Sequence, residues 1–116
     1  MNDVTRPGGD ILERLFRTIE SRRSANPETS HTAKLFQKGT KKIAQKVGEE
    51  AVEVVIEAIR ANRKRLVDES ADLMYHLLVL WADQHVNPAD VWAELCRREG
   101  ISGVAEKAGR DPANED

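Results

Sequence analysis

The chain has little of what several protein classes require. Its 116 residues include one cysteine, and aromatic residues make up only 4% of them. The single cysteine, Cys96, excludes an internal disulfide and a cysteine zinc cluster, and it fits a reducing cytoplasm. The scarcity of aromatic residues disfavours a β-sandwich, whereas 33% of charged residues favours helices with apolar stripes.

The sequence also lacks the marks of a membrane or nucleic-acid partner. Its first residues, MNDVTRPGGD, contain no apolar signal core, and no apolar run reaches membrane-spanning length. The net charge of -2 argues against a general nucleic-acid binder. We therefore expect a soluble cytoplasmic protein with one domain and one core.

Turn and cap signals divide the chain into helices. Asp10 and Thr40 are candidate N-caps, as is Ser30, and Asn87-Pro88 both ends one helix and begins the next. The predicted helices run from 10 to about 24, 31 to 37, 40 to about 62, 63 to 85, and 88 to 98. Residues 1–9 are expected to form a flexible arm, 10–99 the domain, and 100–116 a C-terminal tail.

The two long helices predict an antiparallel hairpin, which is the unit of an all-α helical bundle. The second of them has apolar residues around most of its circumference, so it needs cover on several sides. Because the shorter helices leave this need unmet, we expect a homodimer in which two hairpins form a four-helix core.

Acidic residues recur on both long helices. The stretch KVGEEAVEVVIE places Glu49, Glu50 and Glu53 beside an apolar stripe, and Glu50 falls on the margin of that stripe at about 100° per residue. On the next helix, Glu69 and Asp72 share a narrow strip with His76, hemmed by apolar residues. These carboxylates are therefore expected to be partly buried.

Partly buried carboxylates that face one another need cations, which here means lysines or a metal. Without cysteine pairs or paired histidines, an all-carboxylate set points to a hard ion, and Mg²⁺ fits best because it also keeps phosphate oxygens as ligands. The alternative is an ordinary solvated face, since acids at helical spacing are common. His76 can hydrogen-bond an acid or relay a proton, but we expect it to be a partly buried histidine with satisfied hydrogen bonds.

Lysines are concentrated just before these acids. Since lysine suits polyphosphate and a helix N-terminus near Thr40 adds backbone donors, the segment is a candidate phosphate platform. The alternative is local pairing, for example between Lys46 and Glu50. The candidate substrate-binding residues are Lys34, Lys38, Lys42 and Lys46.

The segments SHTAKLFQKGTKKIAQKVGEEAVEVVIEA and DESADLMYHLLVLW resemble the phosphoribosyl-ATP pyrophosphohydrolase family, over about residues 10–99. The arrangement Glu49-Glu50-x-x-Glu53 with Glu69-x-x-Asp72 resembles the metal motif of the wider all-α, MazG-like nucleotide pyrophosphohydrolases. One departure is His31, where this family leads us to expect an aromatic residue.

The resemblance implies an enzyme of histidine biosynthesis that cleaves phosphoribosyl-ATP to phosphoribosyl-AMP and pyrophosphate, as a homodimer with Mg²⁺. It implies that Glu50, Glu53, Glu69 and Asp72 hold the metal. Glu49 and Glu50 are the candidate catalytic acids, with Glu49 either an outer ligand or the base that orients water.

Two other classes remain open at this point. One is a house-cleaning pyrophosphohydrolase for a non-canonical or pyrimidine nucleotide, with the same metal chemistry. The other is a non-catalytic helical module whose acids and lysines form salt bridges between subunits. The lysine-rich KGTKKIAQK segment favours phosphoribosyl-ATP over a house-cleaning substrate.

Overall fold

The computed structural model describes residues 8–101 and residue 109, and this part of the chain contains helices and no strand. The predicted all-α fold is confirmed. The predicted arm lies almost entirely outside the described residues, as does most of the predicted tail. The helices are α1 (Asp10–Ser21), α2 (His31–Lys38), α3 (Thr40–Ile59), α4 (Arg63–Asp83) and α5 (Pro88–Arg98).

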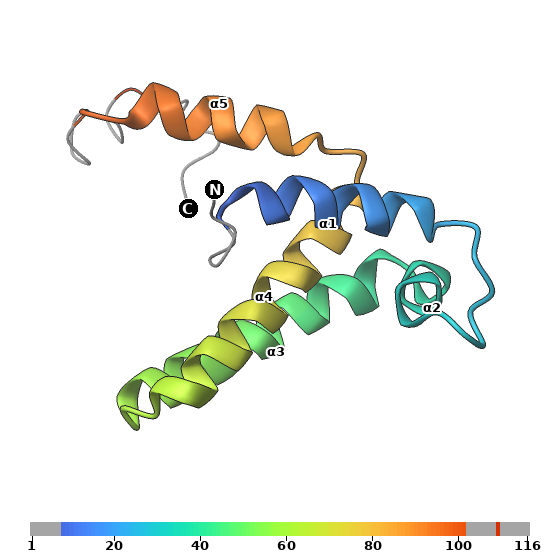
Figure 1. The fold of residues 1–116 in the computed structure, drawn as a ribbon, viewed down its shortest axis with the longest axis horizontal. Helices are drawn as coiled ribbons and strands as arrows, with labels where there is room; N and C mark the ends of the chain where they lie inside the picture. The colour runs from blue at the N-terminus through green and yellow to red at the C-terminus, as the bar shows by residue number, and fades with distance from the viewer. Residues whose placement is uncertain (1–7, 102–108, 110–116) are drawn as a thin grey trace, which may run out of the picture.

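The predicted antiparallel hairpin is formed by α3 and α4, which lie side by side along their length (Figure 1). The connection between them, residues 60–62, is tight because Ala61 adopts a left-handed backbone with φ of 58°. Asn62 then caps α4 by accepting a hydrogen bond from the Arg65 backbone N–H. At the opposite end of the hairpin, the Thr40 hydroxyl donates to Asp83 Oδ2 at 2.5 Å. Both ends of the hairpin are therefore fastened.

The predicted helix starts are partly confirmed. Ser30 caps α2 by accepting from the Ala33 N–H, and Asn87 caps α5 ahead of Pro88. The prediction that Asp10 and Thr40 are caps is wrong, because each is the first residue of its helix and follows a glycine. Gly39 has a φ of 94°, a conformation that glycine adopts readily and that turns the chain sharply from α2 into α3.

The core lies where α1 and α2 pack against the Asp83 end of the hairpin. Its buried residues are Ile19, Leu35, Ile43, Leu78, Val79 and Ala82. Arg23 closes this region, since its guanidinium donates to the Ala82 carbonyl at 2.6 Å and lies over the Phe36 ring. The other end of the hairpin extends past the remaining helices (Figure 1).

The extended part of the hairpin carries an apolar surface that no other element of the described chain covers. We call it the hairpin surface, and its members are Val52, Val55, Ile56, Ile59 and Val67. Ile59 is 80% exposed and Val67 is 66% exposed. The prediction that the second long helix needs cover is therefore met only in part within one chain. In the same described residues, no helix is both long and apolar enough to cross a membrane.

Candidate metal centre

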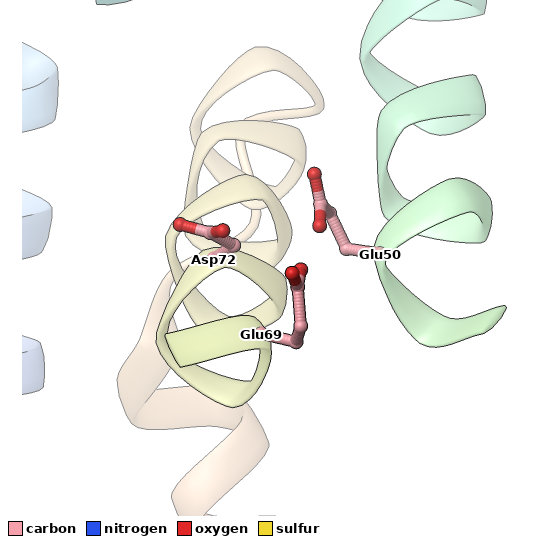
Figure 2. A group of neighbouring side chains, drawn as sticks. All are labelled: Glu50, Glu69 and Asp72. Carbon is pink, nitrogen blue, oxygen red and sulfur yellow. The ribbon is translucent and has the colours of Figure 1, made fainter. Parts of the chain in front are cut away.

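Three of the predicted metal ligands come together in the middle of the hairpin. Glu50 extends from α3, and Glu69 and Asp72 extend from successive turns of α4. One carboxylate oxygen from each lies within 4.8 Å of the others. Figure 2 shows the Glu50 and Glu69 carboxylates facing one another across the gap between the helices. We call these three residues the acid cluster.

The acid cluster is electrostatically strained in the absence of a cation. Desolvation of Glu69 raises the pKa of its carboxyl, and a hydrogen bond and charge from Glu50 raise it further, as does the charge of Asp72. Arg65 opposes this shift only weakly, with its guanidinium 3.9 Å from the Glu69 carboxylate. A proton shared between carboxylates, or a divalent cation, would relieve the repulsion.

The donor set fits a hard divalent ion. Within the described residues, the acid cluster offers only carboxylate oxygens, which Mg²⁺ prefers, and Asp72 is exposed so that water and phosphate oxygens can complete the coordination. Glu50 and Glu69 are half-buried, so their attraction for a cation is screened less than that of a surface acid.

The remaining two predicted acids lie beside the cluster. Glu53 is half-buried on α3, one turn after Glu50, and its charge contributes to the raised pKa of Arg65. Its oxygens are not among those that meet within the cluster. Glu49 is exposed and accepts a hydrogen bond from Gln45 at 2.8 Å, with Lys46 at 3.6 Å. The Gln45 hydrogen bond and the nearby lysines lower the pKa of Glu49, so it is ionised at neutral pH.

The candidate lysines lie on α2 and on the first half of α3. Lys34 and Lys38 are exposed, whereas Lys42 and Lys46 are half-buried. Burial and the charge of His76 lower the pKa of His31, and the charges of Lys46, Lys34 and Lys38 lower it further. The lysine charges therefore converge on His31. Lys46 and Lys42 also act on Glu49, which links this basic region to the acids.

A group of rings joins the basic region to the acid cluster. His31 stacks on Tyr75 with ring centroids 6.2 Å apart, so this position makes a ring contact although it lacks the aromatic residue we expected. His76 lies edge-on to both rings. Its Nδ1 faces the backbone carbonyl of Asp72 at 2.8 Å and not an acid side chain, whereas its Nε2 is buried without a hydrogen-bond partner in the described residues. His76 is nonetheless buried one turn from the acid cluster.

The most deeply buried acid of the described residues was not predicted from the sequence. Glu57 is 2% exposed, and its Oε2 accepts a hydrogen bond from Arg65 at 3.2 Å. On helical spacing it belongs to the row of Glu49 and Glu53, which resembles a solvated face. The only sequence signal was the arginine-rich segment RANRKR that follows, because a buried carboxylate requires a cationic partner.

A helix hairpin with facing carboxylates, beside a group of lysines, is the arrangement expected of an all-α hydrolase that cuts a metal-bound polyphosphate. Residues 12–99 match the family model described as phosphoribosyl-ATP pyrophosphohydrolase, and the chain belongs to this family. The sequence prediction of the family, and with it of a hydrolase of histidine biosynthesis, is confirmed.

Curated relatives agree with the family assignment. The chain is 61% identical to the phosphoribosyl-ATP pyrophosphatase of Azospirillum brasilense, over 86% of this chain and 90% of the relative. It is 59% identical to the enzyme of the same name from Gluconobacter oxydans, over 86% of this chain and 75% of the relative. The identity is also 59% for that of Paramagnetospirillum magneticum, over 86% and 92% of the two chains.

Proposed function

We propose that the chain hydrolyses phosphoribosyl-ATP to phosphoribosyl-AMP and pyrophosphate, with Mg²⁺ held at the acid cluster. The observation that carries this proposal is the approach of Glu50, Glu69 and Asp72 from two helices to within 4.8 Å. The family membership supports the choice of substrate, and the carboxylate donor set supports Mg²⁺ as the metal. We also propose that the enzyme acts in the cytoplasm and has neither nucleic-acid nor membrane partners.

Different residues of the chain would bind the metal and the substrate. Glu50, Glu69 and Asp72 hold the metal, and Glu53 completes the set from the next turn of α3. When bound, Mg²⁺ would offset the charge of the phosphate groups and lower the pKa of an attacking water. Glu49, which is exposed beside Glu50, would orient that water or hold the ion through it. Attack of that water on phosphorus would break the P–O bond between the α and β phosphates, so that pyrophosphate leaves as a unit and phosphoribosyl-AMP is the other product.

The lysines offset the charge of the substrate. Lys42 and Lys46 lie on α3 before the acids, where their ammonium groups are suited to the triphosphate and to the charge that develops on it in the transition state. Lys34 and Lys38, around His31 on α2, are suited to the more distant ribosyl phosphate. The ring group of His31, Tyr75 and His76 lies between these positions and the acid cluster.

Pyrophosphate release from phosphoribosyl-ATP tests the proposed function directly. We expect turnover in the presence of Mg²⁺, none in excess chelator, and full recovery when Mg²⁺ is added back. Turnover that persists in excess chelator would exclude the metal role. Absence of turnover under all conditions, with specific binding to another copy or protein, would favour the non-catalytic helical module.

We further propose that the enzyme is a homodimer joined through the hairpin surface. Several large apolar side chains of this surface are exposed in the single chain, and packing two hairpins into a four-helix core would bury them. Sedimentation at low micromolar concentration should show a species of twice the chain mass.

A charged substitution tests whether the dimer forms through the hairpin surface. Val67→Glu should give a folded monomer, since Val67 is exposed within one chain and its replacement disturbs no core contact. Leu95→Glu on α5, which is also exposed but lies off the hairpin, should leave the dimer intact. A monomeric wild-type protein, or a dimer broken equally by both variants, would count against this interface.

A further inference from the structure

A buried carboxylate is linked to the acid cluster through one arginine without belonging to the cluster. Glu57 is near the end of α3, and one of its oxygens, Oε1, has no hydrogen-bond partner in the described part of the chain. Its other oxygen accepts from Arg65 Nε at 3.2 Å, and the Arg60 guanidinium is 3.9 Å away. Since an isolated charge is costly to bury, Glu57 depends on these arginines, and on Arg65 above all.

Arg65 has a second acidic neighbour, which is a member of the acid cluster. Its Nη2 lies 3.9 Å from Glu69 Oε2, four residues further along α4. Glu57 therefore holds Arg65 by the closer contact, and Glu69 receives only the more distant one. Arg65 is the cation nearest to the acid cluster among the ion pairs of the described residues, so it is the group with which a metal ion would compete for Glu69.

We infer that Glu57 is a positioning residue for the metal centre, which holds Arg65 back from Glu69 and so leaves Glu69 available to a divalent cation. This inference rests on the proposed function, because it takes the acid cluster as the Mg²⁺ site. Glu57 acts only through Arg65 and does not touch substrate or metal. Its negative charge also balances the charge of Arg65, which would otherwise repel an incoming cation at short range.

Calorimetric titration of the metal-free protein with Mg²⁺ tests the inference without relying on turnover. Glu57→Gln keeps the shape of the side chain but releases Arg65 towards Glu69, so we expect the Mg²⁺ affinity to fall about tenfold, or roughly 1.4 kcal/mol. At saturating Mg²⁺ the kcat of this variant should return to the wild-type value, because no catalytic group has been removed.

Substitution of Arg65 should have the opposite effect on the Mg²⁺ affinity. Arg65→Gln removes the competing cation, so we expect Mg²⁺ affinity at or above the wild-type value, together with a lower Tm because Glu57 is left buried and unpaired. The double variant Glu57→Gln, Arg65→Gln should recover both the affinity and the Tm. Lys64→Gln is the matched control, since Lys64 lies on the same turn of α4 but pairs with Asp68 instead.

Each Mg²⁺ titration either supports or contradicts the inference. Unchanged Mg²⁺ affinity in Glu57→Gln would reduce the Glu57–Arg65 pair to a structural contact and overturn the inference. Weaker binding in Arg65→Gln would do the same, because it would mean that Arg65 supports Glu69 for the metal. The variant Glu50→Gln, titrated in parallel, reports on the acid cluster itself. If it binds Mg²⁺ like the wild type, the proposed metal site is wrong, whatever Glu57 does.

Discussion

Removing any one carboxylate of the acid cluster is expected to lower the rate of pyrophosphate release at least about a hundredfold, or roughly 2.7 kcal/mol in the barrier. The variants Glu50→Gln, Glu69→Gln and Asp72→Asn keep side-chain size while removing a proposed metal ligand. Steady-state kinetics with phosphoribosyl-ATP at fixed Mg²⁺ would measure the loss, and far-ultraviolet circular dichroism would verify that helicity is retained.

Two further variants set the limits of the site. Glu53→Gln tests the proposed ligand that lies one turn beyond the acid cluster, and a loss as large as that of Glu50→Gln would include it in the metal set. Glu28→Gln, an exposed acid in the loop before α2, should retain the wild-type rate. Near wild-type rates in all four variants of the proposed metal ligands would show that the hydrolytic centre lies elsewhere. These variants are Glu50→Gln, Glu53→Gln, Glu69→Gln and Asp72→Asn.

The same substitutions should stabilise the metal-free protein, and the effect has a defined pH dependence. The pKa of Glu69 is raised above its ordinary value of 4.5 in the folded chain, so its ionisation opposes folding. Stability from this group is fully present below the unfolded pKa and is lost as the pH rises through the folded pKa. Glu69→Gln should therefore raise the Tm of the metal-free protein at neutral pH, and the gain should shrink towards acidic pH.

Addition of Mg²⁺ should reverse the order of the Tm values of the wild type and Glu69→Gln. The wild-type protein should gain Tm on addition of Mg²⁺, because the ion binds the folded state and removes the repulsion among the carboxylates. Glu69→Gln should gain little, so wild type and variant should approach or exchange their order. If the Tm of metal-free Glu69→Gln stays below that of the wild type from acidic to neutral pH, the carboxylates of the acid cluster do not destabilise the folded protein as we expect.

Phosphoribosyl-ATP is expected to be preferred over ATP, dUTP and dCTP by at least about a hundredfold in kcat/KM, or roughly 2.7 kcal/mol. The acid cluster can explain cleavage of a polyphosphate but not the choice among them. The second phosphate of phosphoribosyl-ATP lies far from the triphosphate and needs cations of its own, which Lys34 and Lys38 can supply. The measurement is pyrophosphate release from the four nucleotides at equal Mg²⁺.

Neutralising the α2 lysines should erode this preference. Lys34→Gln or Lys38→Gln should weaken kcat/KM for phosphoribosyl-ATP about tenfold, as expected for loss of one close charge contact, with little effect on ATP. Lys41→Gln is the matched control, because Lys41 is exposed on α3 and is not among the proposed substrate-binding residues. Faster turnover of dUTP or dCTP than of phosphoribosyl-ATP would favour the house-cleaning alternative.

Local signals in the sequence were sufficient for the order of the helices and for the hairpin. Ser30 and Asn87 act as caps through bonds to residues two or three positions away, which is why their roles can be predicted. Thr40 was misjudged because its hydroxyl bonds Asp83, a partner that only the folded hairpin brings near. Its own helix start is instead determined by Gly39.

The same distinction between local and distant contacts applies to the metal centre. Spacing within α3 and within α4 singled out Glu50, Glu69 and Asp72, and helix geometry placed them on the inner margins of their helices. Spacing could not tell Glu57 from Glu53, since both follow Glu49 at intervals of four residues. Burial of Glu57 depends on Arg65 returning from the far side of the connection, which is a property of the folded hairpin.

The hydrogen bonds at both ends of the hairpin affect how the acid cluster moves. Helices fray from their termini, and here the termini of α3 and α4 are secured by Asn62 at one end and by the Thr40–Asp83 contact at the other. The acid cluster lies between these two points, so brief opening of either end leaves its carboxylates in register. We therefore expect the backbone amides around the acid cluster to exchange with solvent more slowly than those at the two ends of the hairpin.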